Sequence, residues 1–372
     1  MNDAPITRQP TRPSLRRGIT FSLISPAEAS LVTGSAILTV LSFPNFDLWF
    51  LAWVSLVPLL IVVTRTANSR KAFVAGWLWG TIFFYGTCWW LTYPMIHYAA
   101  FRWWLAYPLL LIPIMLVALF PAAACASLPQ IVRRFGPRAI ILAPLIWSSF
   151  EYLRYLVTGQ LWNALGYSQA FHPLIILPAR WGGVYLVSAM LVSPNASVCL
   201  LILRRDVISI LTAAVFLLAP LVLIIAAFGQ LMSEPASSDA SSTFVAGIQP
   251  NVPVDAGDNT SMDDLLNRHI RLSRQALSNA STESYWTRLV IWPESPMNFS
   301  YSRDPHLRQV IGEFARTNHT SVLLNSLEPA KNGGDQNSAI LVNEKGEMSA
   351  RYDKIRLMPF GEYVPLPRWL PG

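Results

Sequence analysis

The sequence predicts a polytopic α-helical membrane bundle of about seven helices, followed by a smaller α/β domain. The first observation is charge, since only 13% of the 372 residues are charged, whereas a soluble domain carries about 25%. The second is that this deficit lies between Ile19 and Gln230, where long apolar runs alternate with short basic loops. The third is that charged residues return at ordinary density from Ser233 onward, which predicts a second domain.

Seven apolar stretches are long enough to be membrane helices, because a spanning helix needs about 20 mostly apolar residues. Proline interrupts several of them, which neighbouring helices in a bundle can tolerate. The sixth also contains Gly182 and Gly183, so we expect it to bend or to lie partly in the interface. The seven stretches are 20–42, 47–64, 72–92, 103–128, 138–156, 172–203 and 207–229.

The basic residues predict the orientation of these helices. The N-terminal tail and the loops after the second, fourth and sixth stretches carry Arg or Lys, whereas alternate loops such as PNFD and TGQLWNALGYSQAFH carry neither. Because basic loops stay in the cytoplasm, we expect a cytoplasmic N-terminus and a C-terminal part outside. The net charge of +7 is then explained by the basic loops that orient the membrane helices, and we expect no nucleic-acid partner.

The change in composition also sets the expected domain boundaries. We expect a cytoplasmic tail over residues 1–18 and a transmembrane bundle over residues 19–230. A linker is expected over residues 231–242, where SEPASSDASS is rich in small polar residues. Residues 243–372 would then form the second domain outside the cytoplasm, which in a bacterium would be the periplasm.

Glu151 and Arg154 are charged residues one helical turn apart, near the outer end of the fifth stretch. Charges at membrane depth are costly and usually paired, so they call for an explanation. Two interpretations stay open at this point. The residues form a self-neutralising structural pair, or they mark the place where a lipid headgroup or a substrate enters.

The cysteines limit the chemistry that the chain can carry. Cys88, Cys125 and Cys199 all lie in apolar stretches, and we interpret them as small packing residues. Their spacing offers neither a disulfide framework nor a zinc motif. We therefore expect no metal and no cofactor.

The second domain alternates strand and helix patterns in the order β-α-β-α-β-β. Asp304, followed by a proline, is a good N-cap for its second helix, and NEKGE predicts a hairpin near the end. This order indicates a layered α/β or α+β domain. The predicted segments are strands at 243–252, 288–295, 321–328 and 337–354, and helices at 262–280 and 304–319.

Three charged residues of this domain are candidates for chemistry. Glu294 ends a strand after Pro293, where a carboxylate beside apolar walls can act as a base. Lys354 follows the last strand, where an ammonium group can stabilise an oxyanion. Glu362 lies further on, between Gly361 and a tyrosine, in the rigid segment MPFGEYVP.

These residues give the sequence its resemblance to a known family. VIWPES, YDKIRLMPFGEYVP and GIQPNV resemble the nitrilase-like domain of bacterial apolipoprotein N-acyltransferases. FPNFDLWFLAWVSLVPLL, EYLR and GQLWNALGY resemble the membrane half of that family, so the resemblance covers essentially the whole chain. It implies a multi-pass protein of the bacterial inner membrane, with seven helices before a periplasmic nitrilase-like domain of αββα type.

The resemblance also implies an activity and roles for the candidate residues. Glu294 would be the general base, Lys354 would stabilise the oxyanion, and Glu362 would support the site. A cysteine nucleophile would take an acyl chain from a phospholipid donor as a thioester. The α-amino group of the diacylglyceryl-cysteine of an apolipoprotein would then accept that chain.

The sequence departs from the family pattern in one decisive place. In the family the nucleophilic cysteine follows the PFGE segment, but residues 231–372 contain no cysteine. We therefore expect only the N-terminal part of the nitrilase-like domain, with no nucleophile in this chain and no activity on its own. The alternatives are a truncated inactive remnant, a membrane-tethered nitrilase-type amidase and, from helix count alone, a transporter.

Overall fold

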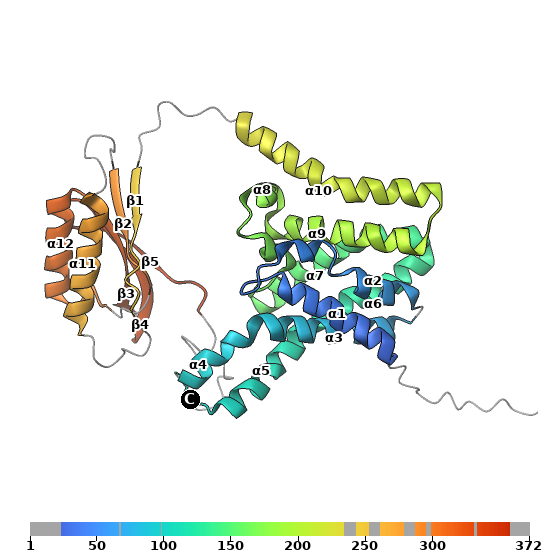
Figure 1. Cartoon of the computed structure of the whole chain (residues 1–372). Coiled ribbons are helices and arrows are strands. Elements are labelled where there is room, and N and C mark those ends of the chain that lie inside the picture. The colour runs from blue at the N-terminus through green and yellow to red at the C-terminus, as the bar shows by residue number, and fades with distance from the viewer. Residues whose placement is uncertain are drawn as a thin grey trace, which may run out of the picture. The chain divides into compact units, whose positions relative to one another are not determined.

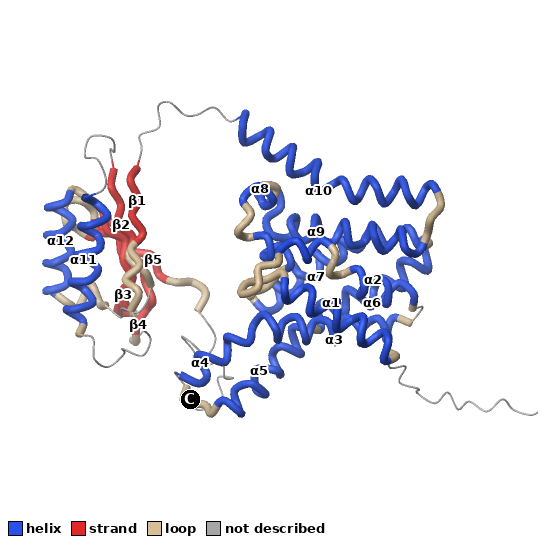
Figure 2. The backbone as a smooth tube through the Cα atoms, viewed as in Figure 1, coloured by secondary structure: helices blue, strands red, loops and turns tan. Residues whose placement is uncertain are grey.

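The computed structural model of the chain divides into two compact units, Met1–Pro235 and Ala236–Gly372. Figure 1 shows a helical first unit and a second unit in which helices pack on a sheet, and Figure 2 shows the same division by secondary structure. The structure describes residues 24–66, 68–97, 99–233, 243–252, 261–278, 287–294, 299–330 and 333–357.

The first unit is built from helices that pack side by side. All seven predicted apolar stretches contain helix. The helices are α1 Pro26–Leu41, η1 Trp49–Trp53, α2 Val57–Arg65, α3 Ser69–Cys88, η2 Trp89–Leu91, α4 Thr92–His97, α5 Trp103–Val117, α6 Leu119–Phe135, η3 Pro137–Leu142, α7 Ala143–Thr158, η4 Leu165–Gln169, α8 Pro173–Ile176, α9 Ala179–Leu203 and α10 Val207–Ser233.

Four helical segments of the described chain are long and apolar enough to cross a membrane. The number of crossings stays a prediction, because other helices of the unit are shorter or less apolar. The sixth predicted stretch bends as expected, since Gly182 and Gly183 have non-helical backbone angles inside α9. The four segments are Trp103–Phe135, Pro137–Thr158, Ala179–Leu203 and Val207–Ser233.

Small residues let α3 and α6 approach closely. A Cβ atom added at Gly76 would lie 2.8 Å from the Cα atom of Ala122, and one added at Gly80 would lie 2.7 Å from Pro121 Cγ. Close approach through small residues is how helices pack in lipid, where the hydrophobic effect does not drive helices together. The contact between α3 and α6 therefore depends on the absence of side chains at Gly76 and Gly80.

Asn195 of α9 makes hydrogen bonds to the backbone where the chain passes from η1 to α2. Its Nδ2 donates to Ala52 O at 3.0 Å, and its Oδ1 accepts from Leu56 N at 2.8 Å. These two backbone groups lie at the irregular junction between η1 and α2. Because unpaired backbone groups are costly in an apolar interior, this buried amide stabilises the junction.

The second unit has one five-stranded sheet, with α11 (Met262–Ser278) and α12 (Pro305–Asn318) on one face (Figure 1). The strand order is β1-β2-β3-β4-β5; the first three strands are parallel and the last three antiparallel. The structure confirms the predicted β-α-β-α-β-β order and the hairpin. The strands are β1 Thr243–Gly247, β2 Thr287–Ile291, β3 Ser321–Pro329, β4 Asp335–Val342 and β5 Met348–Asp353.

The core of this unit lies between the sheet and the two helices. Val322 and Leu324 of β3 are buried against Leu307 and Ile311 of α12, whereas the alternate residue Leu323 is only partly buried. Successive side chains of a strand point to opposite faces, so Leu323 belongs to the face away from the helices. Asp304 caps α12 as predicted, accepting from the backbone N–H groups of the first turn.

Glu328 is a fully buried carboxylate that holds the turn leading into α12. It accepts hydrogen bonds from the backbone N–H and the hydroxyl of Ser302 and from the hydroxyl of Ser326, and Arg351 Nη1 lies 3.9 Å away. Burial raises the pKa of Glu328, but the hydrogen bonds outweigh burial and hold this pKa below its usual value. The ionised carboxylate therefore joins β3 to the turn.

We expect Gly76→Ala to lower the stability of the helical unit by about 1–3 kcal/mol, because the new methyl group collides with α6 backbone. Thermal unfolding of the full chain in detergent measures this loss. Gly34→Ala is the matched control, since a Cβ atom at Gly34 of α1 meets nothing within 4 Å. Equal stabilities of the two variants would contradict the close contact between α3 and α6.

We expect Glu328→Gln to destabilise the second unit at neutral pH by about 1–3 kcal/mol. A carboxyl group with a lowered folded pKa stabilises the fold above its unfolded pKa of about 4.3, and this contribution disappears as pH falls through the folded pKa. The wild type should therefore lose stability below about pH 4, and the variant should show a weaker loss. Amide protection factors at residues 299–304 report both effects.

Glu344→Gln, on the exposed hairpin, is the control for this substitution. It should keep the wild-type protection factors and their dependence on pH. A Glu328→Gln variant with the same pH dependence as the wild type would show that this carboxylate does not stabilise the turn.

Candidate active site and the buried charges of the bundle

Glu294 and Lys354 form an ion pair at one edge of the second unit. Lys354 Nζ lies 2.9 Å from Glu294 Oε1, although the two residues are 60 positions apart in the sequence. Both side chains keep part of their surface exposed, 33% for the lysine and 55% for the glutamate. The structure thus brings together two of the three residues that the sequence singled out, and leaves them accessible to a substrate.

Asn337 is a third member of this cluster that the sequence analysis missed. Its Nδ2 donates to the same Glu294 oxygen at 2.7 Å. Asn325 Nδ2 in turn donates to Asn337 Oδ1 at 2.5 Å, which fixes the orientation of the Asn337 amide. A signal was present in the sequence, because the polar residues of DQNS open an otherwise apolar strand.

Strand register explains why these four residues meet. Glu294 follows β2, Asn325 lies in β3, Asn337 lies in β4 and Lys354 follows β5, so neighbouring strands contribute one residue each. The backbone N–H of Lys354 donates to Asn337 O at 2.8 Å, which extends the pairing of β4 and β5 by one residue. We call this set the cross-sheet row.

Asp353 fixes the end of β5 just before the lysine. Its carboxylate accepts from Ser338 Oγ and from Arg351 Nε, both at 2.6 Å. These hydrogen bonds, with the positive charge of Arg351, hold the pKa of Asp353 below its usual value. The backbone that carries Lys354 is therefore held by side chains as well as by strand pairing.

An open cleft of about 330 Å³ adjoins the cross-sheet row. It places a carboxylate that can take a proton beside an ammonium group that can stabilise an anion. Glu362, the third predicted member, lies outside the described residues. The cleft is lined by Trp292, Glu294, Leu323, Leu324, Asn325, Asn337, Ser338, Ala339, Tyr352 and Lys354.

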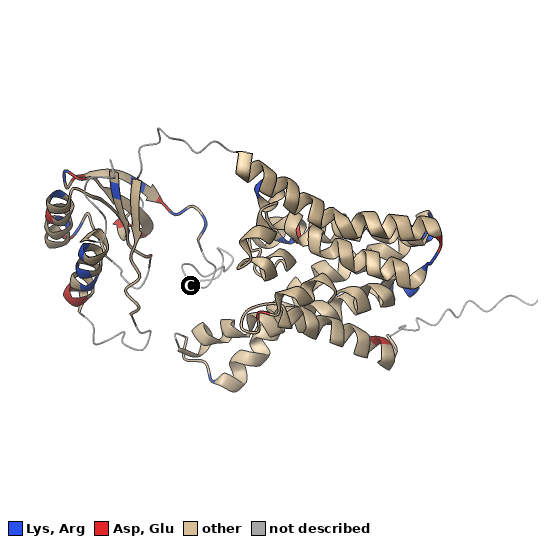
Figure 3. Cartoon of the chain, turned by 45° about the horizontal axis from the view of Figure 1, so that its top comes forward, with Lys and Arg blue, Asp and Glu red and all other residues tan. Residues whose placement is uncertain are grey.

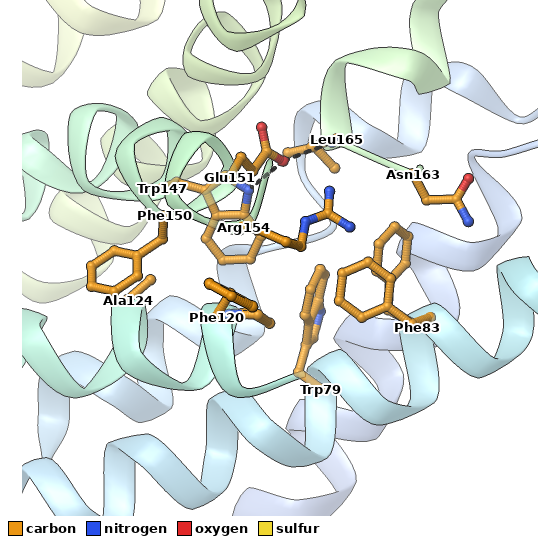
Figure 4. Close-up of a pocket in the computed structure, with 12 residues that line it drawn as sticks. Trp79, Phe83, Phe120, Ala124, Trp147, Phe150, Glu151, Arg154, Asn163 and Leu165 are labelled. Carbon is orange, nitrogen blue, oxygen red and sulfur yellow. Dashed lines mark hydrogen bonds between the residues drawn. The ribbon is translucent and has the colours of Figure 1, made fainter. Parts of the chain in front are cut away.

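Glu151 and Arg154 are buried in the helical unit, with exposed fractions of 8% and 4%. Figure 4 shows them in a pocket with aromatic walls. Glu151 Oε1 accepts from the Trp147 indole at 3.1 Å and from Leu165 N at 2.8 Å. Arg154 Nη1 donates to Trp162 O at 2.7 Å. Both side chains therefore hold the segment that follows α7.

Within the described residues, no direct ion pair joins Glu151 to Arg154. The guanidinium carbon of Arg154 instead lies 4.9 Å from the centroid of the Phe84 ring, a cation–π contact. The residues therefore do not form the expected self-neutralising pair. Arg154 and the Oε1 atom of Glu151 have partners of their own, which favours a structural role, whereas Glu151 Oε2 is buried without a hydrogen-bond partner among the described residues. The idea that a lipid headgroup or substrate enters here stays a prediction.

The three cysteines are buried in α3, α6 and α9, as packing residues should be. Asn163 Nδ2 contacts Cys88 Sγ at 2.9 Å, and Thr64 Oγ1 lies 3.7 Å from Cys199 Sγ. Among the residues described, no three His, Cys, Asp or Glu side chains come together in a way that could hold a metal ion.

Fold and candidate site together fit a membrane protein in which apolar helices precede an α/β unit with an ion-paired Glu–Lys cluster. The family description "Apolipoprotein N-acyltransferase N-terminal domain" matches residues 35–197, within the helical unit. Relatives that bear the family name align with nearly all of the chain. The chain belongs to the apolipoprotein N-acyltransferase family.

Three relatives, each named apolipoprotein N-acyltransferase, illustrate the similarity. The protein of Geobacter metallireducens is 32% identical over 365 residues, covering 94% of this chain and 67% of the relative. That of Azotobacter vinelandii is 32% identical, covering 93% and 66%, and that of Pseudomonas putida is 31% identical, covering 90% and 65%. The chain thus spans about two thirds of the length of these relatives.

We expect Arg154→Met to loosen the segment that follows α7, because the Trp162 carbonyl and the Glu151 carboxylate lose a cationic neighbour. The expected cost is about 2 kcal/mol or more, and hydrogen exchange at residues 159–165 measures the loosening. Arg102→Met, at an exposed arginine, is the control. Unchanged exchange in the Arg154 variant would contradict the structural role and favour the functional one.

Proposed function

We propose that this protein acts in lipoprotein maturation in the bacterial inner membrane. It would transfer a fatty acyl chain from a membrane phospholipid to the N-terminal α-amino group of the diacylglyceryl-cysteine of apolipoproteins. The observation that carries this proposal is the Glu294–Asn337–Lys354 cluster, in a chain that belongs to the apolipoprotein N-acyltransferase family.

In the complete protein, the proposed acyl transfer passes through a thioester. Glu294 takes the proton of a thiol, and the thiolate attacks the phospholipid ester carbonyl. Lys354 Nζ lies 2.9 Å from Glu294 Oε1. Once Glu294 is protonated, its electrostatic attraction to Lys354 weakens, so the ammonium group turns to the developing oxyanion. The lysophospholipid leaves with the proton from Glu294, and the acceptor amine then attacks the thioester and releases the thiol.

Two further residues support the reacting groups in this proposal. Asn337 holds the Glu294 carboxylate in one orientation through its hydrogen bond, and Glu362 is the supporting carboxylate. We do not assign the nucleophile to Cys88, Cys125 or Cys199, because all three are buried in helices of the first unit.

The remaining proposals concern architecture and location. The mixed sheet covered by α11 and α12 supports a nitrilase-like domain at 243–372, after a linker at 231–242. Long apolar helices support a transmembrane bundle at 19–230, preceded by a cytoplasmic tail at 1–18. The alternation of basic loops supports a periplasmic position for the second unit.

The full-length gene in which the coding sequence of this chain lies should restore N-acylated lipoproteins in a strain depleted of its own apolipoprotein N-acyltransferase. Glu294→Gln should lower acylation by about 10²–10⁴-fold through loss of the base. Lys354→Ala should lower it by about 10²–10³-fold through loss of oxyanion stabilisation. Mass spectrometry of lipoprotein N-termini measures the acylated fraction.

Matched controls come from the exposed hairpin of the same unit. Glu344→Gln and Lys345→Ala remove the same kinds of charge away from the cleft and should leave acylation unchanged. Failure of the unmodified gene to restore acylation would contradict the proposed function and favour an inactive remnant. Full activity in either cleft variant would contradict the assigned roles.

A further inference from the structure

A basic pocket lies at one end of the helical unit, where the turn after α6 meets the turn between α9 and α10. Its volume is about 230 Å³, several times the ~30 Å³ that a water molecule occupies in the liquid. Figure 3 shows the basic colour beside the acidic colour at the turn between α9 and α10. The pocket is lined by Phe135, Gly136, Pro137, Arg138, Arg204, Asp206 and Ser209.

Arg138 is held in a fixed position on one wall. Its Nη2 lies 2.7 Å from Asp206 Oδ1, and its Nε donates to Ser209 Oγ at 3.1 Å. Asp206 is also occupied, because its carboxylate accepts from the hydroxyl and the backbone N–H of Ser209. The negative charge of Asp206 is thus balanced by Arg138, and its oxygens also accept hydrogen bonds from Ser209 at the start of α10.

Arg204 supplies a second guanidinium group on the pocket wall. It is exposed, and within the described residues its side chain makes no hydrogen bond and no ion pair. The pocket residues therefore carry a net positive charge of one unit. An arginine fork matches the oxygens of a phosphate group, with which it can form two parallel hydrogen bonds.

The surface beside the pocket is apolar. Phe135 is 66% exposed, and Val207, Ile208 and Leu211 at the start of α10 are 71%, 59% and 61% exposed. Acyl chains can cover such side chains, whereas a free anion cannot. A cationic pocket beside exposed aliphatic side chains fits a ligand that has both an anionic head and a hydrocarbon tail.

We propose that this pocket binds the phosphate group of an anionic phospholipid, with Arg204 as its direct ligand and Arg138 as a fixed second cation. The lipid tails lie along the first turns of α10. Because basic loops mark the cytoplasmic side, the lipid belongs to the inner leaflet. This pocket shares no residue with the cleft beside Glu294, and its proposed ligand does not depend on the acyl-transfer reaction.

Native mass spectrometry of the full chain in detergent tests the proposal, with phosphatidylglycerol and phosphatidylcholine as probes. Phosphatidylglycerol should bind more tightly, and Arg204→Ala should weaken its binding by about tenfold or more, because the charge-assisted hydrogen bonds from the Arg204 guanidinium group to the phosphate are lost. Arg205→Ala is the matched control. It removes the same charge one residue away but does not line the pocket, so binding should stay nearly unchanged.

Arg204→Lys should bind with intermediate affinity, since it keeps the charge but loses the fork. Equal losses in the Arg204 and Arg205 variants would show general attraction to basic loops and would overturn the site. Unchanged binding in Arg204→Ala would overturn it as well. Displacement of phosphatidylglycerol by millimolar inorganic phosphate alone would show a free-anion site and overturn the lipid assignment.

Discussion

The ion pair between Glu294 and Lys354 is the interaction on which the candidate site depends. Its two residues follow β2 and β5, so the pair forms only when β3 and β4 lie between them in the correct register. A slip of one residue would turn the Asn337 side chain to the other face of the sheet. The hydrophobic core between the sheet and α12 prevents that slip, because the same alternation buries Val322 and Leu324. Core packing thus positions the polar groups.

The two units meet different solvents, and their sequences differ accordingly. In the helical unit many exposed side chains are aliphatic or aromatic. Cohesion therefore depends on close contacts such as Gly76 against Ala122, and on satisfied buried polar groups such as Asn195. The second unit follows the rules of a soluble domain, with an apolar core on one face of the sheet. Its buried carboxylate, Glu328, is balanced by hydrogen bonds to a turn. Both units belong to the family sequence, because relatives align with nearly the whole chain.

Much of the fold followed from the sequence, because membrane helices and amphipathic segments have strong periodic signals. The fourth stretch was expected to end at residue 128, but the helix continues to Phe135. The boundary was placed too early because the last helical turn carries Arg133 and Arg134, and a search for apolar residues assigns such charged residues to a loop. Glu294 and Lys354 could be singled out because short motifs surround them. Asn337 was missed, because the polar start of its strand is a weak signal and its contact with Glu294 depends on strand register, which no local pattern encodes.

The central claim is that Glu294 and Lys354 act as one catalytic unit, and a double-mutant cycle on lipoprotein N-acylation tests it most directly. Groups that work in the same step are strongly non-additive. The account predicts that the double variant Glu294→Gln with Lys354→Ala loses no more activity than the more damaging single variant. Losses that multiply, as for independent residues, would contradict it.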